Sequence, residues 1–455
     1  MVGAGEPIGQ SGIFGNDLGT MLDPNQPIYR LSKKIPWSIL TEALSKRYAA
    51  GGRPSLPLRR MIGLTILKHL HDLSDDALVA GWQQNPYWQF FCGETHFQWT
   101  LPCDPSEMTR FRKRIGVDGC ERILKASLDI QTAPVDVTAK VVIDSTVQEK
   151  NITYPTFAKL DAKVADRCRV IAKREGITLR QTFVRVLGKL RIAARNYRHK
   201  NPAVRRKARR AERRIRTIAR KMLRDLIRKM TPEQREDHAG VLKAMGVVVR
   251  QTAEPGSERM HSLHEPGVIC IAKGKPHKPY EFGSKVSIAI EPATGLVVAA
   301  HVVPGRQHDR ASVPETLEQV KRLTGQVPKQ AICDLGYRGK EMEGQTKIIT
   351  PASLKGTTGS TRKRLRRLLR RRQVVEATIG RMKSLHRLDR NRLGKELGDK
   401  LNVLLAAAGN NFRVWLRILC ALAHAWIESC ISDAWPWVRR HCELEIRPMT
   451  MGYAA

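Results

Sequence analysis

The sequence predicts an α/β protein that carries additional helical regions. Three observations favour this class. Short runs of β-branched and other apolar residues, such as 141–143 and 286–290, are typical of buried strands. Residues 35–115 repeat apolar side chains at helical spacing. A long basic stretch over 159–230 also has apolar residues at spacings that suit a helix.

Length and charge limit what the chain can be. Its 455 residues exceed one ordinary hydrophobic core, so we expect about two or three domains. Lys and Arg total 80 against 43 Asp and Glu, which gives a formal net charge of +37. This excess repels itself unless a polyanion is nearby, and it points to nucleic acid as the partner. A membrane surface is the weaker alternative, because we find no convincing amphipathic helix or lipid signal.

Cysteine usage and hydropathy favour a cytoplasmic protein. The nine cysteines are scattered singly without a Cys-x-x-Cys pair, which argues against a zinc ribbon or a disulfide framework. The first 19 residues lack the basic-then-apolar order of a signal peptide. The apolar segment 401–431 is interrupted by polar and charged residues, so we expect a buried or partner-facing helical region and no membrane span. We therefore expect a cytoplasmic location.

The first 130 residues divide into two predicted parts. Residues 1–30 are rich in Gly, Pro and Asn without a period, and we expect a flexible tail. Residues 31–130 are predicted to form a helical N-terminal DNA-binding domain. Its helix over 106–114 carries a basic face that includes Arg110 and Arg112. Such a face suits a DNA-binding helix, although a merely solvated surface is about as probable.

The next segment, 131–157, is predicted to begin the α/β core. Three β-branched residues at 141–143 run into Asp144, which would then lie at the carboxyl end of a buried strand. Loops that leave strand ends are where many α/β sheets place their chemistry. The alternative is that Asp144 only caps the following turn.

Residues 158–260 are predicted to form a basic helical insertion. Apolar residues recur at spacings that suit a helical hairpin or bundle with one buried stripe. Arg206 and Arg210 belong to nearly unbroken basic blocks. Because few acids alternate with these bases, pairing within a helix cannot neutralise them. Phosphate contact is favoured over a merely solvated face.

The rest of the core is predicted over 261–400, followed by a C-terminal helical region over 401–455. A helix is expected over 312–323 and a flexible basic loop over 355–364. Asp334 directly follows a predicted strand. The predicted strands are 268–271, 286–290, 296–303, 330–333 and 347–351, of which the second and third form a hairpin.

A later helix supplies a third acid. Leu369, Arg372, Glu376 and Lys383 are spaced by three, four and seven, so they share one helix face. An exposed, salt-bridged face is the ordinary alternative. If the strands before Asp144 and Asp334 are neighbours and this helix packs beside them, three carboxylates converge.

Converging carboxylates repel one another and are costly without a cation. Hard divalent ions such as Mg²⁺ accept an all-oxygen shell and leave room for water and phosphate. Two such ions about 3.5–4 Å apart would support phosphodiester chemistry. The positive charge of the chain would hold a nucleic-acid backbone against the site.

These residues resemble a known family, the bacterial insertion-sequence DDE transposases of the InsH type. The resemblance covers nearly everything after the tail. Arg372, Glu376 and Lys383 match the motif Y-x2-R-x3-E-x6-K. The other matching segments are 144–146 with 151–156, 264–266 with 273–275, 280–283, and Asp334 with 336–339.

The resemblance implies an RNase H-like catalytic core, in which a mixed sheet is flanked by helices. It implies that Asp144, Asp334 and Glu376 bind Mg²⁺, for which Mn²⁺ would substitute. Arg372 and Lys383 are implied to contact DNA, and we expect Tyr337 and Arg338 of the second-aspartate motif to do so as well. Asp309, with its neighbour His308, is implied to line the site.

Two departures from the family pattern are visible. Leu369 stands where the motif has Tyr, so that a ring contact to DNA is lost or supplied elsewhere. Phe157 stands where related sequences commonly show Asp. Neither change removes an expected metal ligand.

The leading hypothesis is a transposase that binds terminal inverted repeats, cleaves the element's ends and joins them to target DNA. Its partner is double-stranded DNA, and family analogy implies a homodimer because two ends must be held together. A metal-dependent nuclease without strand transfer is the second hypothesis. A non-catalytic DNA-binding protein, whose acids only cap strands, is the third.

Overall fold

The structure is a computed structural model, and it describes residues 17–49, 51, 54–131, 135–252, 254, 259–272, 278–305, 307–339 and 341–441. The chain divides into two compact units. One comprises residues up to 137 together with 290–298 and the chain from 405, and the other comprises 138–289 and 299–404. Within the described ranges, no helix is both long enough and apolar enough to cross a membrane.

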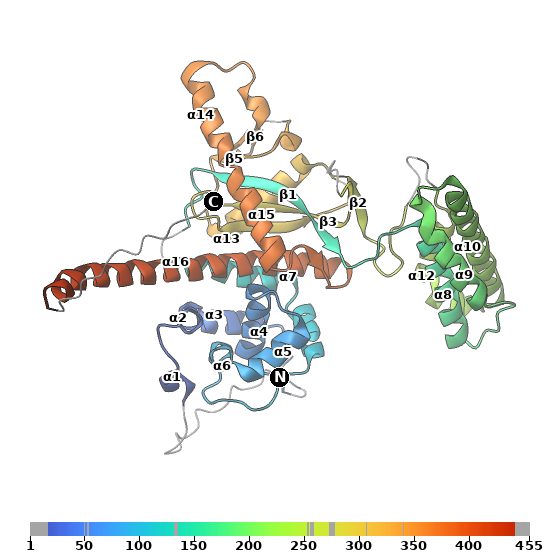
Figure 1. Cartoon of the computed structure of the whole chain (residues 1–455), viewed down its shortest axis with the longest axis horizontal. Coiled ribbons are helices and arrows are strands. Elements are labelled where there is room, and N and C mark those ends of the chain that lie inside the picture. Colours follow the sequence, from blue (N-terminus) through green and yellow to red (C-terminus); the bar gives the residue numbers. More distant parts are fainter. Residues whose placement is uncertain are drawn as a thin grey trace. The chain divides into compact units, whose positions relative to one another are not determined.

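Helices make up the described chain before residue 131 (Figure 1). Pro36 and Pro57 are the N-cap residues of two of them, and three others begin at a proline. Ser74 Oγ accepts a hydrogen bond from the Ala77 N–H and caps a third helix. The helices are α1 (Leu18–Met21), α2 (Pro27–Lys34), α3 (Trp37–Ser45), α4 (Leu58–Leu70), α5 (Asp75–Gln84), α6 (Pro86–Cys92) and α7 (Pro105–Asp129).

The predicted tail is wrong from residue 17 onward. Helix α1 and the start of α2 fall inside 17–30, and Leu18 and Leu22 are buried in a cluster with Phe90. The sequence did not reveal these buried apolar residues, because they are few and the helical segments are too short to show a period. Residues 1–16 lie outside the described residues.

A mixed sheet forms the centre of the second unit. Among the described residues it has eight strands, in the order β2-β3-β1-β5-β7-β6, with β4 on β3 and β8 on β1. The pairs β1–β5, β5–β7 and β1–β8 are parallel, whereas β2–β3 and β6–β7 are antiparallel. The strands are β1 (Val141–Lys150), β2 (Ile269–Ala272), β3 (Tyr280–Ile290), β4 (Val297–Val303), β5 (Gln330–Ile332), β6 (Met342–Glu343), β7 (Thr346–Ile349) and β8 (Arg390–Asn391).

Strand β1 continues past Asp144, which corrects the prediction that Asp144 ends a strand. Its first residues, Val141 and Val142, pair with β5. Its last residues, Glu149 and Lys150, pair with β8. Asp144 is therefore the fourth residue of a ten-residue strand and is held by sheet pairing on both sides.

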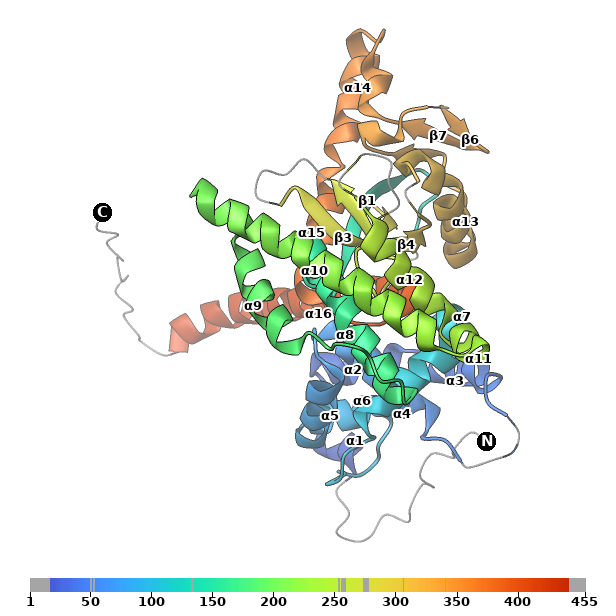
Figure 2. The same ribbon diagram turned by 90° about the vertical axis from the view of Figure 1, so that its right-hand side faces the viewer.

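Two helices cover the sheet on opposite sides (Figure 2). Helix α13 (Val313–Thr324) contacts β3 through a hydrogen bond between the Thr316 and Ser287 hydroxyls, and β4 through Gln319, whose Oε1 accepts from the Ala300 N–H. Helix α15 (Gln373–Leu385) packs against β1. It follows α14 (Gly359–Arg370), which begins inside the segment 355–364 that we expected to be a loop. The predicted single helix is thus two helices, interrupted at 371–372.

The insertion is a helical bundle, as its periodicity predicted (Figure 1). Residues Ile215, Ile218, Met222 and Leu226 of the longest helix are buried in its core. Ile192, which the same pattern placed in the stripe, is 63% exposed. The helices are α8 (Phe157–Arg174), α9 (Val184–Ala194), α10 (Pro202–Lys229), α11 (Pro232–Asp237) and α12 (Ala239–Arg250).

The last helix, α16 (Lys395–His441), begins six residues before the predicted boundary at 401. Its first turns close a buried polar cluster at the end of β1. Lys150 Nζ lies 2.8 Å from Oδ1 of Asp399, and both side chains are less than a tenth exposed. Ser284 Oγ donates a hydrogen bond to the same carboxylate. A buried ion pair with this many partners fixes the end of β1 against the helix.

Candidate active site

Two of the predicted acids are placed by adjacent strands of the sheet: Asp144 lies in β1, and Asp334 lies two residues after the end of β5. The parallel register pairs Val141 with Ala331 and Val142 with Ile332. Continuing that register by two residues places Asp144 beside Asp334. Neighbouring strands are about 4.8 Å apart, so the two carboxylates share one small region of the sheet.

The Asp144 carboxyl is mostly shielded from water. Burial raises its pKa, and the nearby carboxylates of Asp334 and Asp309 raise it further, while a hydrogen bond and Arg372 act in the opposite direction. The hydrogen bond runs from the Ser145 N–H to Asp144 Oδ1 at 2.7 Å. The Asp144 carboxyl therefore lies close enough to other carboxylates for their charges to disfavour its ionised form.

Asp334 follows β5 and caps the short 3-10 helix η3 (Leu335–Tyr337), where its Oδ1 accepts a hydrogen bond from the Leu335 N–H at 2.7 Å. The same oxygen lies 3.1 Å from Nη1 of Arg372. Arg372 Nη2 lies 3.9 Å from Oε1 of Glu376, one turn along α15. Arg372 thus contacts two of the three predicted acids, and its charge also acts to lower the pKa of the third, Asp144. Glu376 is the most open of them, with 65% of its side chain exposed.

This donor set fits a hard divalent cation in its chemistry, since all the ligand atoms it offers are carboxylate oxygens. The raised pKa of Asp144 fits as well, because it reflects a shielded carboxyl beside other negative groups. Across the described chain, however, no three His, Cys, Asp or Glu side chains are grouped closely enough to hold a metal ion. Arg372 now contacts two of the three acids and supplies the positive charge there.

Sequence patterns gave little or no signal for two further residues beside the acids, Asp309 and Lys285. Asp309, which the resemblance alone suggested, accepts a hydrogen bond from Ser145 Oγ at 2.6 Å. Lys285 of β3 forms an ion pair with the same Asp309 oxygen at 2.7 Å. The alternation of β3 could have shown that Lys285 interrupts an apolar strand, but nothing local pairs it with Asp309.

The predicted DNA contacts next to the acids divide into two groups. Arg338 is exposed and Lys383 is half-buried in the last turn of α15, so both retain surface that DNA could reach. Tyr337 is only 1% exposed, and burial raises its pKa well above the usual value. The prediction that Tyr337 contacts DNA is therefore wrong for this structure, because its ring is part of the core.

A similar correction applies in the N-terminal helices. Arg112 is 2% exposed and forms two hydrogen bonds to the carboxylate of Asp75, at 2.8 and 2.7 Å. It is a buried structural residue, so it does not belong to a DNA-facing surface. Arg110, on the other hand, is 66% exposed beside Glu107.

The two arginines singled out in the insertion lie on the solvent side of α10. Arg206 and Arg210 are exposed, whereas Ala208 and Ala211 between and after them are buried. The amphipathic division of α10 is therefore clear. Its apolar side makes the bundle core and its outer side carries positive charge.

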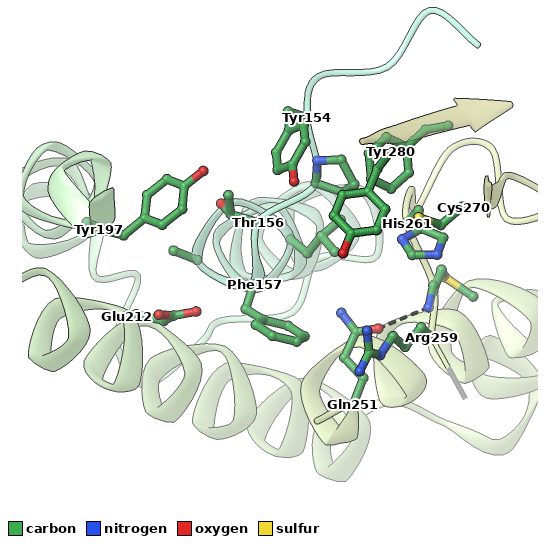
Figure 3. Close-up of a pocket in the computed structure, with 16 residues that line it drawn as sticks. Tyr154, Thr156, Phe157, Tyr197, Glu212, Gln251, Arg259, His261, Cys270 and Tyr280 are labelled. Atoms are coloured by element: carbon green, nitrogen blue, oxygen red, sulfur yellow. Dashed lines mark hydrogen bonds between the residues drawn. The ribbon is translucent and has the colours of Figure 1, made fainter. Parts of the chain in front are cut away.

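A cavity of about 400 Å³ lies where α8 begins, among residues of the insertion and of strands β2 and β3 (Figure 3). Phe157, the family departure noted above, lines it and has the Arg216 guanidinium 5.0 Å from its ring centre. Arg198 lies 5.8 Å from the ring centre of Tyr154 and 5.3 Å from that of Tyr197. The cavity is thus lined by aromatic rings with arginines against them.

Comparisons with known proteins indicate the family of this chain. A family model described as a transposase domain (DUF772) matches residues 16–114, and one described as a transposase DDE domain matches residues 259–410. A Rhizobium meliloti protein described as uncharacterized protein ORF8 in the nfe locus is 42% identical over 195 residues, which cover 42% of this chain and 94% of that protein. The DDE-domain match includes Asp334 and Glu376.

One solved structure is also similar, at a low level. It is a piggyBac transposase synaptic complex with hairpin DNA, determined by cryo-EM. The match has a TM-score of 0.33 and 10% sequence identity, and it covers 88% of this chain and 76% of that chain.

Proposed function

This chain belongs to the DDE transposase family, and from that premise we propose that it cuts DNA at the ends of an insertion sequence and joins them to target DNA. The observation that carries the proposal is that Arg372 contacts both Asp334 and Glu376, while the charges of Arg372 and Asp334 act on the Asp144 carboxyl. We further propose that the mixed sheet with its two flanking helices is an RNase H-like catalytic core.

In this proposal Asp144, Asp334 and Glu376 hold Mg²⁺, with Mn²⁺ as a substitute. When bound, two such ions would activate the attacking oxygen and stabilise the leaving oxygen of the phosphodiester. Arg372 would exchange its carboxylate partners for a DNA phosphate, since a guanidinium matches both groups. Lys383 and Arg338 would hold neighbouring phosphates and keep the strand in place.

Double-stranded DNA is the proposed partner along a wider surface. The exposed basic side of α10, including Arg206 and Arg210, would contact phosphates without reading sequence. Arg110 would contribute from the N-terminal helices. Two copies would act together as a homodimer, because transposition requires both element ends.

The aromatic cavity adds a finer element to the proposal. Phe157, Tyr154 and Tyr197 present rings on which an unstacked base could lie, and the adjacent arginines would hold its phosphates. A 2-aminopurine placed near the element end reports unstacking by a rise in fluorescence. We expect the rise with the parent chain and about half of it or less with Phe157→Ala.

The central experiment is a cleavage and joining assay. A DNA fragment with the ends that flank the gene is incubated with a target plasmid, with and without Mg²⁺. Asp334→Asn should abolish cutting while DNA binding persists, because the change removes a charge and keeps the shape. Asp129→Asn is the matched control: that carboxylate is as exposed as Asp334 (49%) and also pairs with a cation.

Three outcomes separate the hypotheses. Metal-dependent cutting at a fixed position, followed by joined products, supports the transposase. Cutting without joining in the presence of target would identify a nuclease. Binding without cutting, in the parent chain and with either metal, would overturn the enzymatic proposal.

A further inference from the structure

We propose that Asp309 is a positioning residue that fixes Asp144 and Asp334 relative to each other. The inference rests on the proposed function, since it assigns those two acids to one reaction centre. Asp309 itself would act through its neighbours and would not touch the DNA.

The link to Asp144 runs through one residue. Asp309 begins the 3-10 helix η2 (Asp309–Ser312), which connects β4 to α13. Its Oδ1 accepts the Ser145 hydroxyl hydrogen at 2.6 Å. The N–H of the same Ser145 donates to Asp144 Oδ1 at 2.7 Å. Holding Ser145 by its side chain therefore fixes the N–H that orients the Asp144 carboxylate.

The link to Asp334 runs through a glycine. A Cβ placed on Gly336, two residues after Asp334, would lie 2.9 Å from Oδ2 of Asp309. Only a residue without a side chain lets η3 approach Asp309 this closely. One carboxylate thus contacts the chain just after each acid, with one oxygen toward Ser145 and the other toward Gly336.

A lysine holds Asp309 in this position. Lys285 Nζ lies 2.7 Å from Asp309 Oδ1 and also donates a hydrogen bond to the Gln307 carbonyl at 2.9 Å. The two side chains are 15% and 28% exposed, so the pair is shielded from solvent. Lys285 offsets the repulsion that Asp309 would otherwise exert on Asp144 and pins the segment before η2 to strand β3.

Four variants test the role. Asp309→Ala removes both links, and Ser145→Ala removes only the link to β1. Asp309→Asn keeps an oxygen that can accept from Ser145 and should restore much of the loss. Glu343→Gln is the matched control, because Glu343 pairs with Arg310 of the same η2 segment at 2.8 Å and is similarly exposed (31%).

Two quantities are measured for each variant: Mn²⁺ affinity without DNA, by electron paramagnetic resonance, and the single-turnover cleavage rate at saturating protein. We expect Asp309→Ala to weaken Mn²⁺ binding and to slow cleavage by about tenfold or more, with DNA affinity unchanged. Glu343→Gln should leave both quantities unchanged. The Ser145→Ala/Asp309→Ala double variant should lose little more than Asp309→Ala, since Ser145 acts through a link that Asp309→Ala has already removed.

The two proposals fail in different ways. If the parent chain neither binds Mn²⁺ nor cuts, the proposed function is overturned and this inference falls with it. If the parent is active and Asp309→Ala matches it in both quantities, the positioning role alone is overturned. Should Asp309→Ala not fold, Asp309→Asn and Ser145→Ala decide: a Ser145→Ala variant with the Mn²⁺ affinity and cleavage rate of the parent would contradict the role.

Discussion

The guanidinium of Arg372 lies 3.1 Å from Oδ1 of Asp334, and only about a fifth of the arginine side chain is exposed. The Asp334 carboxylate is therefore already paired with a cation before any ligand binds. The same arginine reaches toward Glu376. In this arrangement one side chain competes with a metal ion for two of its three proposed ligands.

Replacing Arg372 by Gln should therefore change binding and catalysis in opposite directions. Mn²⁺ affinity should rise by roughly fivefold, because a half-exposed ion pair contributes about 1 kcal/mol or less. Cleavage should fall by about a hundredfold, since a phosphate loses its charged donor. Calorimetric titration and single-turnover assays measure the two effects. Arg371→Gln, at the exposed neighbouring position, is the control, and weaker Mn²⁺ binding by Arg372→Gln would contradict the competition.

Arg112 should matter for stability. Burial opposes ionisation of Asp75, but hydrogen bonds and charges from Arg112 and Lys68 prevail and lower its pKa to about 2. Arg112→Met leaves that carboxylate with one partner fewer and should lower the free energy of unfolding by about 3 kcal/mol. Denaturant titration measures the change. Arg110→Met, at a 66% exposed position, should cost less than about 0.5 kcal/mol. Equal effects of the two variants would contradict the structural role.

Asp161 should make the stability of the helical insertion depend on pH. Burial raises its pKa from 3.8 to about 6, although Arg216 at 3.0 Å partly offsets this. Because the folded pKa exceeds the unfolded one, the folded state binds the proton more tightly. The contribution to stability is therefore present at acid pH and is lost as the pH rises toward 6.

The parent chain should gain about 2 kcal/mol over Asp161→Asn when the pH is lowered from 7 to 4. Denaturant unfolding of both chains, monitored at each pH, isolates this residue from other titrating groups. A stability difference that does not vary with pH would show that the carboxyl keeps its usual pKa.

The basic side of α10 should appear in the salt dependence of DNA binding. Each phosphate contact contributes about 0.9 to the slope of log affinity against log salt. Changing Arg206 and Arg210 together to Gln should reduce that slope by about 2. Arg228→Gln is the control, because this arginine of the same helix pairs with Asp225 at 2.7 Å. An unchanged slope in the double variant would remove α10 from the DNA surface.

Gly283 should tolerate no side chain. A Cβ at this position of β3 would lie 2.0 Å from the Gln148 carbonyl oxygen of β1, and both groups are backbone. Gly283→Ala should lower the free energy of unfolding by about 3 kcal/mol or more, because the strands must separate. Gly188→Ala in α9, where nothing lies within 4 Å, should instead be neutral or stabilising. Thermal unfolding compares the two.

Sequence reasoning located the acids because their signals are local. A β-branched run marks 141–143, and helical spacing joins Arg372 to Glu376. The length of β1 could not be predicted in this way. Its second half is a strand because it pairs with Arg390 and Asn391, about 240 residues later in the chain.

The wrong site residues have a common cause. Helical spacing shows which residues share a face, but it does not show whether a residue from another helix, such as Asp75, pairs with them. Arg112 was therefore predicted to be on the surface. Tyr337 sits in a polar motif yet packs inward. Lys285 and Asp309 meet only because β3 and η2 are brought together by the fold.

Because β1 is paired on both sides of Asp144, we expect the part of the candidate site around Asp144 to be more rigid than the part around Glu376. Amide hydrogens around Asp144 are secured by β5 before it and β8 after it, so we expect them to exchange with solvent only when the whole unit opens. Glu376 stands one turn after the break at 371–372, where helical hydrogen bonding is interrupted. Amide hydrogens near Glu376 should therefore exchange with solvent faster by orders of magnitude. Any movement that brings the three acids closer together would then be a movement of α15, while β1 stays in place.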